Sequence, residues 1–349
     1  MLLNAFDVDP GAAERTLELQ AGELFGLGLQ ADVLVVSAWR GSYTPVPGTL
    51  VHRLQEVCGL DLARCPRALD CSDSPVGAWI SPPLDQIGGG IRWSEATRTR
   101  FSRIAVVESP HQPVGDAIEP WPVFQQLFSL LALLPLQGIQ CPVVATPLLS
   151  AGNQQVAPRR LFPALLASCR SGFRHVPDLE RLIVFDRQQE PLQWLATQID
   201  VELGRNPADR QRITLDGIEA LREGLLGVLA GFGRLHPQLA NEVDLHELQH
   251  LIADGQVSPV ALGLHSRRLV ELLVRHKLGW RRGTLYQGLQ SLQRADINPW
   301  ILSCLHQVRV FGNWMGHPSP PHRQQAVSSV DITTMMASLQ RVLECYPWP

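Results

Sequence analysis

Residues 143–156 constrain the fold of this chain more than any other segment, because they join a buried strand to a small polar loop. The apolar run at 142–148 has the length and composition of a strand that is covered on both faces. Ser150, Ala151 and Gly152 follow it, and their small side chains let a ligand approach the backbone closely. α/β folds bind nucleotides in such loops at the carboxyl ends of parallel strands, although an ordinary strand-to-helix turn has the same pattern.

Strand-like and helix-like segments alternate through the first half of the chain. Strands are expected at 15–20, 32–37, 103–108, 142–148 and 179–186, and helices at 124–134 and 159–172. This order predicts an α/β fold in which helices cover both faces of a mostly parallel sheet. Ligands of such folds bind at the carboxyl ends of the strands, which selects the loops at 37–49, 109–116 and 150–155.

Composition limits the class of protein. A chain of 349 residues, 45% of them apolar, is long enough for two domains with separate cores. A net charge of −3 provides no global basic field for long nucleic acids. The seven cysteines include no Cys-x-x-Cys pair, which favours a reducing compartment over a disulfide framework. No segment resembles a membrane span or a signal peptide, so we expect a soluble cytoplasmic protein without a membrane partner.

Four segments of the first half resemble the motifs of a macro domain. They are Gly22-Glu23-Leu24, the strand that ends in Ser37-Ala38-Trp39, the loop at 40–49 and the loop at 150–154. The resemblance covers residues 14–190 and implies an ADP-ribose-like nucleotide as the ligand, with no further cofactor and no metal. It implies these ligand-binding residues: Glu23, Leu24, Ser37, Trp39, Tyr43, Gly48, Thr49, Ser150, Ala151, Gly152, Asn153 and Gln154.

The same resemblance assigns roles within that set. Glu23 would meet the adenine, and a helix that opens at Gly48 and Thr49 would hold a phosphate with its free N–H groups. The loop at 150–154 would line the distal phosphate and the second ribose. Tyr43, like Trp39, would either stack on a base or pack in the core or at a surface rim, and both alternatives stay open.

Two departures from the family pattern bear on catalysis. Ser37 and Trp39 replace asparagines, and the family's glycine loop becomes Tyr43-Thr-Pro-Val-Pro-Gly48, which is stiffer because two prolines fix φ. ADP-ribose hydrolysis in the family uses that asparagine and that loop, so the resemblance implies binding rather than hydrolysis. Another glycine run, at 88–90, is interpreted as a mobile loop or lid.

The second half carries helical spacing. A polar segment at 200–207 predicts a domain boundary, and helices are expected at 213–229, 262–278, 285–293, 299–311 and 329–343. This pattern predicts an all-α helical bundle. We therefore expect a macro-like domain at 1–195, a connector or helical linker at 196–245 and a helical domain at 246–349.

Residues 309–318, Arg-Val-Phe-Gly-Asn-Trp-Met-Gly-His-Pro, resemble the closing motif of a bacterial helical domain of unassigned function in the HEPN superfamily. The wider pattern agrees at Arg268, Glu271, Leu285 and Asp331. HEPN ribonucleases join Arg and His from two protomers, so the resemblance implies RNA as a substrate, a homo-oligomer and three catalytic residues: Arg309, Asn313 and His317. The alternative is a polar network of the same residues that fixes helix packing or a dimer interface.

A third motif points to different chemistry. His246-Glu247-Leu-Gln-His250 matches the His-Glu-x-x-His pattern of zinc peptidases, in which the glutamate activates water. A third metal ligand is required, but Gln256 occupies the place of the extended-motif histidine. A polar helix face is therefore the simpler interpretation.

The two resemblances together imply a sensor of an ADP-ribose-derived signal nucleotide, coupled to a HEPN-like helical effector in bacterial antiphage defence or stress response. Macro-containing effectors of Thoeris-like systems are similar, which implies an NAD-consuming TIR-type partner enzyme as the source of the signal. A non-enzymatic nucleotide-binding protein with a helical dimerisation domain is the second hypothesis. A zinc metallopeptidase is the third.

Overall fold

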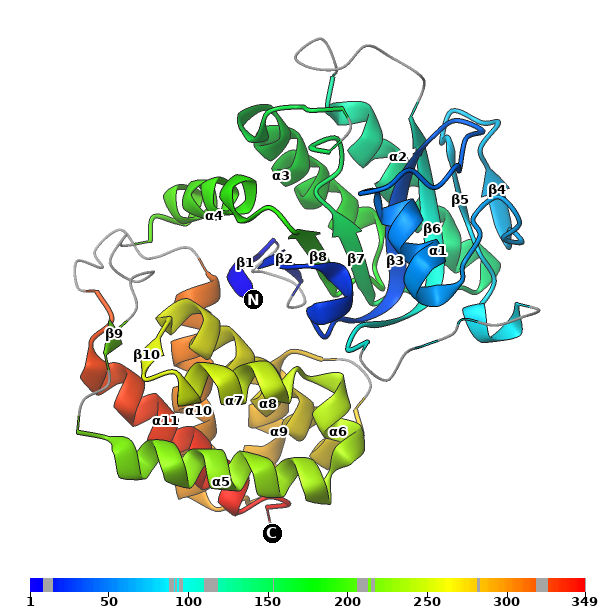
Figure 1. Cartoon of the computed structure of the whole chain (residues 1–349). Helices are drawn as coiled ribbons and strands as arrows, with labels where there is room; N and C mark the ends of the chain where they lie inside the picture. The colour runs from blue at the N-terminus through cyan, green and yellow to red at the C-terminus, as the bar shows by residue number, and fades with distance from the viewer. Residues whose placement is uncertain are drawn as a thin grey trace. The chain divides into compact units, whose positions relative to one another are not determined.

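The computed structural model of this chain forms two compact units (Figure 1). It describes residues 1–8, 15–87, 91, 93, 97–109, 119–152, 154–205, 213–214, 217–280, 283–317 and 326–348. The first unit comprises residues 15–196 with Met1, and the second comprises residues 2–14 and 197–349. The first is α/β and the second is helical, so the predicted fold classes are confirmed.

A mostly parallel sheet forms the centre of the first unit. Its strands lie in the order β2 (Thr16–Ala21), β8 (Arg181–Asp186), β7 (Val143–Pro147), β3 (Gln30–Trp39), β6 (Arg100–Ser109), β5 (Ala78–Ile80) and β4 (Leu69–Cys71). The first five strands are parallel, whereas β5 and β4 run antiparallel to their neighbours. The five longer strands confirm those expected from the sequence.

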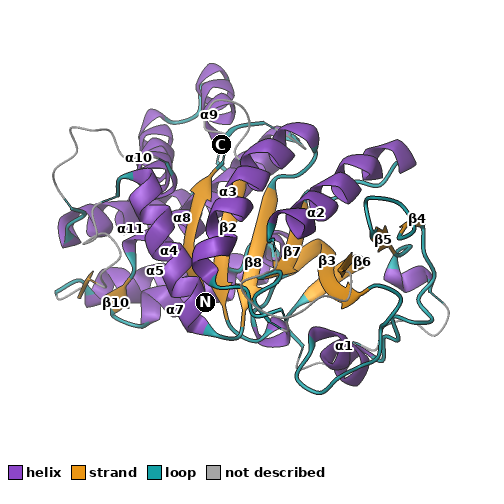
Figure 2. Cartoon of the chain, turned by 90° about the horizontal axis from the view of Figure 1, so that it is seen from above, coloured by secondary structure: helices purple, strands orange, loops and turns teal. Residues whose placement is uncertain are grey.

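Helices cover both faces of this sheet, as Figure 2 shows. On one face lies α1 (Leu50–Cys58), whose Leu54 packs in one cluster with Leu34 and Val36 of β3. On the other lie α2 (Trp121–Leu133) and α3 (Pro158–His175). Residues 33–36 of β3 are 0% exposed because both faces of the strand are covered. Short 3-10 turns complete the unit: η1 (Leu24–Gly26), η2 (Leu84–Gln86) and η3 (Leu134–Gln137).

The second unit is a helical bundle. Its helices are α5 (Glu219–Leu235), α6 (Pro237–Glu242), α7 (Leu245–Ala253), α8 (Pro259–Leu278), α9 (Leu285–Arg294), α10 (Pro299–Gly316) and α11 (Ser329–Glu344). At its centre, α8 is buried along most of its length and contacts α7, α9 and α10. Strand β1 (Leu2–Asp7) lies against α8 and α10, and β9 (Ile213–Thr214) pairs with β10 (Gln256–Val257). No helix in the described ranges combines the length and the apolar character needed to cross a bilayer.

Several expectations need correction. Residues 213–229 do not form one helix, because β9 occupies the start and α5 begins only at Glu219. The polar segment expected to begin a boundary at residue 200 lies partly in α4 (Gln189–Leu203), whose polar side chains resemble a linker in sequence. Within the expected connector, α5 packs against α7 and α11. The glycine run at 88–90, the loop at 110–116 and the pair Asn206-Pro207 fall outside the described residues.

A buried polar cluster in the second unit joins the end of α4 to β1. Asn4 Nδ2 donates to Asp200 Oδ1 at 2.9 Å, and Arg205 Nη1 lies 3.0 Å from the same oxygen. Arg205 also donates to Asn4 Oδ1 and, through Nη2, to the carbonyl oxygen of Ala5 at 2.7 Å. The side chains of Arg205 and Asp200 are 0% and 7% exposed, so this ion pair is almost completely removed from water.

Candidate functional site

The loops that follow β2, β3, β7 and β8 meet at one edge of the sheet, here called the carboxyl edge (residues 22–24, 40–49, 148–155 and 187). Gly22 N donates to the carbonyl oxygen of Asp186 at 2.9 Å, and Leu148 N donates to that of Phe185 at 3.1 Å. A Cβ built on Gly48 lies 4.0 Å from Arg187 Nη2. These contacts bring the expected segments around Glu23, Gly48 and Ser150 to the same edge.

Glu23 and Leu24 differ in their access to this edge. One carboxylate oxygen of Glu23 accepts from Phe25 N at 3.0 Å, and the other lies 3.4 Å from Arg53 Nη2. The Glu23 side chain is 46% exposed and remains accessible. Leu24 is buried in the core cluster beside α1, so its side chain serves packing.

The helix expected at Gly48 and Thr49 is present. Thr49 caps α1 by accepting from His52 N at 3.2 Å, and Gly48 adopts a φ of 86°, which favours glycine. The N–H groups of Leu50 and Val51 lie in the first turn of α1, where helix geometry offers no acceptor. This end of α1 is therefore suited to an anion.

The loop after β7 contains a residue in an unusual conformation. Ser150 has a φ of 66°, a region that costs a non-glycine residue about 1 kcal/mol or more, and it is only 8% exposed. Its hydroxyl makes no hydrogen bond to any described residue, while its carbonyl accepts from Val156 N at 3.0 Å. Ala151 and Gln154 are partly exposed and Gly152 is exposed. Asn153 lies outside the described residues.

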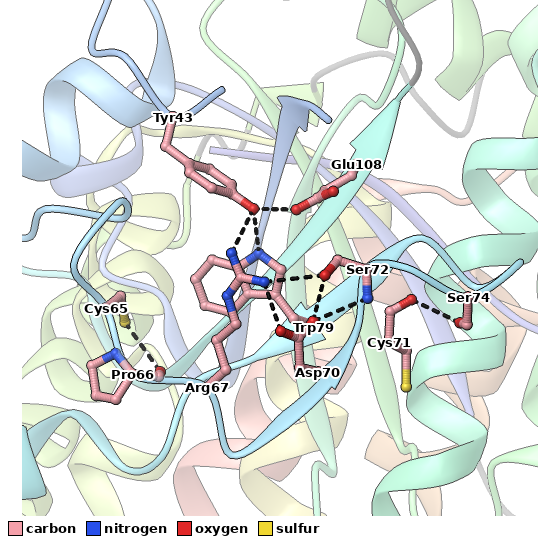
Figure 3. Close-up of polar contacts among 10 residues, drawn as sticks. All are labelled: Tyr43, Cys65, Pro66, Arg67, Asp70, Cys71, Ser72, Ser74, Trp79 and Glu108. Atoms are coloured by element: carbon pink, nitrogen blue, oxygen red, sulfur yellow. Dashed lines mark hydrogen bonds and ion pairs between the residues drawn. The ribbon is translucent and has the colours of Figure 1, made fainter. Parts of the chain in front are cut away.

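Tyr43 is the centre of a polar cluster on the same side of the sheet (Figure 3). Its hydroxyl donates to Glu108 Oε1 and accepts from Arg67 Nη2 and Trp79 Nε1, each at 3.0 Å. Burial and the hydrogen bond to Glu108 raise the pKa of Tyr43 to about 12, so the phenol stays protonated at neutral pH. These contacts connect the loop at 40–49 to β5 and β6. Because the hydroxyl of Tyr43 is hydrogen-bonded within the protein, the ring is held in place and is not positioned to close over a base.

Ser37 and Trp39 lie at the carboxyl end of strand β3. Ser37 is exposed, and Trp39 is partly exposed and accepts from Ser42 N at 2.9 Å, where the loop turns back. Three residues of this region were not predicted from the sequence: Arg67, Glu108 and Arg187. Of these, only Glu108 could have been identified, because a charged residue directly after a buried apolar run marks the end of a strand.

The expected catalytic residues of the second unit contact different groups. The guanidinium of Arg309 lies 5.3 Å from the ring centroid of Tyr286 on α9. His317, the C-cap of α10, has its Nδ1 4.0 Å from Asp7 Oδ2, and Arg267 Nη2 lies 3.9 Å from the same oxygen. Asp7 and Arg267 were missed because β1 and α8 are far from the motif in sequence.

Asn313 and the motif's glycines lie close to the crossing of α8 and α10. Asn313 is partly exposed, and its Oδ1 is buried without a hydrogen-bond partner among the described residues. A Cβ on Gly312 would lie 2.5 Å from Arg267 Cβ, and one on Gly316 would lie 3.3 Å from Arg267 Nη1. The glycines therefore allow α8 to pass closely, with Arg267 between the two helices. This steric role explains the two glycines of the motif without any catalytic function.

The zinc-peptidase pattern lies on α7, which ends at Ala253. His246 and His250 are exposed. Throughout the part of the chain that the structure describes, no three His, Cys, Asp or Glu side chains are grouped so that they would hold a metal ion. The motif therefore has no third ligand among these residues, and the interpretation as a polar helix face is retained.

Comparison with known proteins gives a family match for part of the chain and likenesses to solved structures. A family model described as a domain of unknown function (DUF4145) matches residues 254–345. No curated protein matches the chain. The first unit resembles a macrodomain of Trypanosoma brucei, crystallised with ADP and with ADP-ribose, at 15% and 16% sequence identity. These alignments cover 55% and 56% of this chain and 73% and 74% of the other, with TM-scores of 0.38 and 0.39.

Proposed function

We propose that the first unit binds an ADP-ribose-like nucleotide at the carboxyl edge. The observation that carries the proposal is Ser150, a buried polar residue held at positive φ, whose hydroxyl has no hydrogen-bond partner among the residues that the structure describes. Residues kept in such conformations cluster at ligand-binding positions, because the surrounding structure must offset their strain. The loop follows a parallel strand, which is where open α/β sheets bind their ligands.

The other groups at this edge suit the parts of such a ligand. The accessible carboxylate of Glu23 can accept a hydrogen bond from the amino group of adenine. The first turn of α1, opened by Gly48 and capped by Thr49, suits a phosphate, and the loop at 150–154 suits the distal phosphate and ribose.

Binding without hydrolysis is favoured by the same region. Ser37 and Trp39 stand where the family has asparagines, and the prolines of the loop at 40–49 limit its movement. The cluster around Tyr43 restrains that loop further. A ligand held in this way acts as a signal rather than as a substrate.

Calorimetric titration of the whole chain with ADP-ribose tests the proposal, and we expect saturable binding. Replacing Ser150→Gly should weaken it roughly 2- to 10-fold, the value of one lost hydrogen bond. Because glycine accepts positive φ at no cost, the variant should be at least as stable as the wild type. If titration with ADP-ribose, ADP and NAD gives no heat of binding, the proposed function is refuted.

The helical unit would be the output module of this sensor. We propose that the nucleotide, made by an NAD-consuming TIR-type enzyme during antiphage defence or stress, shifts the assembly of this unit by differential affinity. An apolar groove of about 350 Å³ between α10 and α11 supports assembly through this unit, since Val310 at its rim is 53% exposed. RNA cleavage through a HEPN-like site is supported by the acid and the cation beside His317.

An RNA-cleavage assay with ADP-ribose present separates an enzyme from a non-enzymatic binding protein. We expect a homo-oligomer by light scattering and cleavage that His317→Ala abolishes, because the imidazole is the proton-transfer group near neutral pH. His250→Ala, at an exposed histidine of α7, is the control and should keep full activity. Intact RNA with the wild-type chain would leave the helical unit with a binding or dimerisation role only.

A further inference from the structure

We propose that Arg187 is a further ligand-binding residue, which recognises a phosphate of the nucleotide through its guanidinium group. This inference rests on the proposed function. It adds a side-chain cation to a site whose other phosphate contacts would come from backbone N–H groups and a hydroxyl.

The place of Arg187 follows from the order of the strands. It directly follows β8, which lies between β2 and β7 in the sheet. The last residue of β8, Asp186, accepts from Gly22 N at 2.9 Å, and Phe185 accepts from Leu148 N at 3.1 Å. Arg187 therefore leaves the sheet between the loop that carries Glu23 and the loop that carries Ser150.

The side chain of Arg187 reaches a third segment of the carboxyl edge. Its Nη2 lies 4.0 Å from the position of a Cβ on Gly48. Gly48 has no side chain to fill that space, and its φ of 86° makes a larger residue unfavourable. The guanidinium thus lies beside the loop that leads into the first turn of α1.

The guanidinium of Arg187 is exposed, and it forms no ion pair or side-chain hydrogen bond with any residue in the described ranges. Its charge and its backbone N–H do act on the neighbouring carboxylate of Asp186, whose pKa they lower against the larger effect of burial. Its neighbour Asp186 uses Oδ1 to accept from Gln188 N at 2.9 Å. Arg53, at the same edge, pairs instead with Glu23 and Glu56. A guanidinium that forms no ion pair, placed beside an N-terminal helix turn, adds to the local positive potential.

Phosphate is the chemistry that fits this arrangement. A guanidinium offers parallel N–H donors that match two oxygens of a phosphate group. The N–H groups of α1 approach the same space from the side of Gly48. A diphosphate has enough oxygens to contact both, whereas an uncharged nucleoside would contact neither.

The test compares ADP-ribose binding to three variants of the whole chain by calorimetry. We expect Arg187→Gln to weaken binding about 10- to 100-fold, the range for a hydrogen bond to a charged group. Arg187→Lys keeps the positive charge but lacks the parallel N–H donors of the guanidinium, and it should retain part of the affinity. Arg174→Gln is the matched control, because this exposed arginine lies near the end of α3, before β8 begins, and should bind as the wild type does. The difference between Arg187→Gln and the wild type should shrink at 1 M salt.

Each outcome bears on one proposal. If the wild type binds ADP-ribose and Arg187→Gln binds equally well, the role of Arg187 is refuted while the proposed function stands. Equal weakening in Arg187→Gln and Arg174→Gln would also refute it, because the effect would then reflect net charge alone. If the wild type binds no nucleotide, the proposed function itself fails. Both arginines are exposed, so thermal unfolding of the variants should match that of the wild type.

Discussion

Replacing Arg205→Met is expected to lower the free energy of unfolding by about 3–5 kcal/mol. Arg205 is fully buried, and its guanidinium satisfies Asp200, Asn4 and the carbonyl oxygen of Ala5. Methionine fills much of the volume but leaves the carboxylate of Asp200 buried without its cation. Denaturant unfolding followed by fluorescence measures the loss, with Arg174→Met as an exposed control that should change little.

A second variant separates the charge from the packing. Asp200→Leu combined with Arg205→Met removes both charges, so it should recover a good part of the stability lost in the single variant. A loss below about 1 kcal/mol in Arg205→Met would show that water reaches the cluster in solution. The cluster then would not fix β1 to the end of α4.

Replacing Gly312→Ala is expected to lower the free energy of unfolding by about 1–3 kcal/mol, the usual cost of overpacking a core. The new methyl would lie 2.5 Å from Arg267 Cβ and 2.9 Å from the carbonyl oxygen of Gly263. One of these neighbours is backbone and the other is the root of a buried side chain. Neither can move without shifting α8 against α10, so we expect a value at the upper end.

Gly231→Ala is the matched control for this prediction. Gly231 lies inside α5, and a Cβ there meets no atom within 4 Å. Alanine favours the helix over glycine by about 0.5–1 kcal/mol, so this variant should be more stable than the wild type. Opposite signs for the same substitution would identify steric contact as the cause. A neutral result for Gly312→Ala would mean that α8 and α10 are farther apart in solution.

The strands and helices that the sequence predicts are those with a strong local pattern. The continuous apolar runs of β3, β7 and β8 are visible because both faces of these strands are covered. Strands β4 and β5 have three residues each, too few to show any period. The start of α1 at Gly48 and Thr49 was expected only from the resemblance to a macro domain, and the structure has this helix. By contrast, α4 was not predicted as a helix, and its last residues were included in the expected boundary because of their polar side chains.

The candidate site was predictable only in part, for a related reason. Small residues identified the loop around Ser150, but its positive φ depends on how the loop is held between β7 and α3. The sequence contains many arginines, and Arg187 is distinguished only by its position beside Gly48 in the structure. The acid near His317 lies on β1, and that acid's own partner, Arg267, lies on α8, so no local pattern predicts either. Residues joined by tertiary contacts cannot be paired from one sequence.

The second unit has a consequence for synthesis, because it is assembled from both ends of the chain. A ribosome releases β1 first, but the helices that β1 contacts, α8 and α10, emerge only after residue 258 has been made. The first unit is continuous apart from Met1, so all of its residues have been made before α8 and α10 emerge. Any fragment that begins after β1 also lacks the acid beside His317, so the helical unit needs the first residues of the chain to be complete.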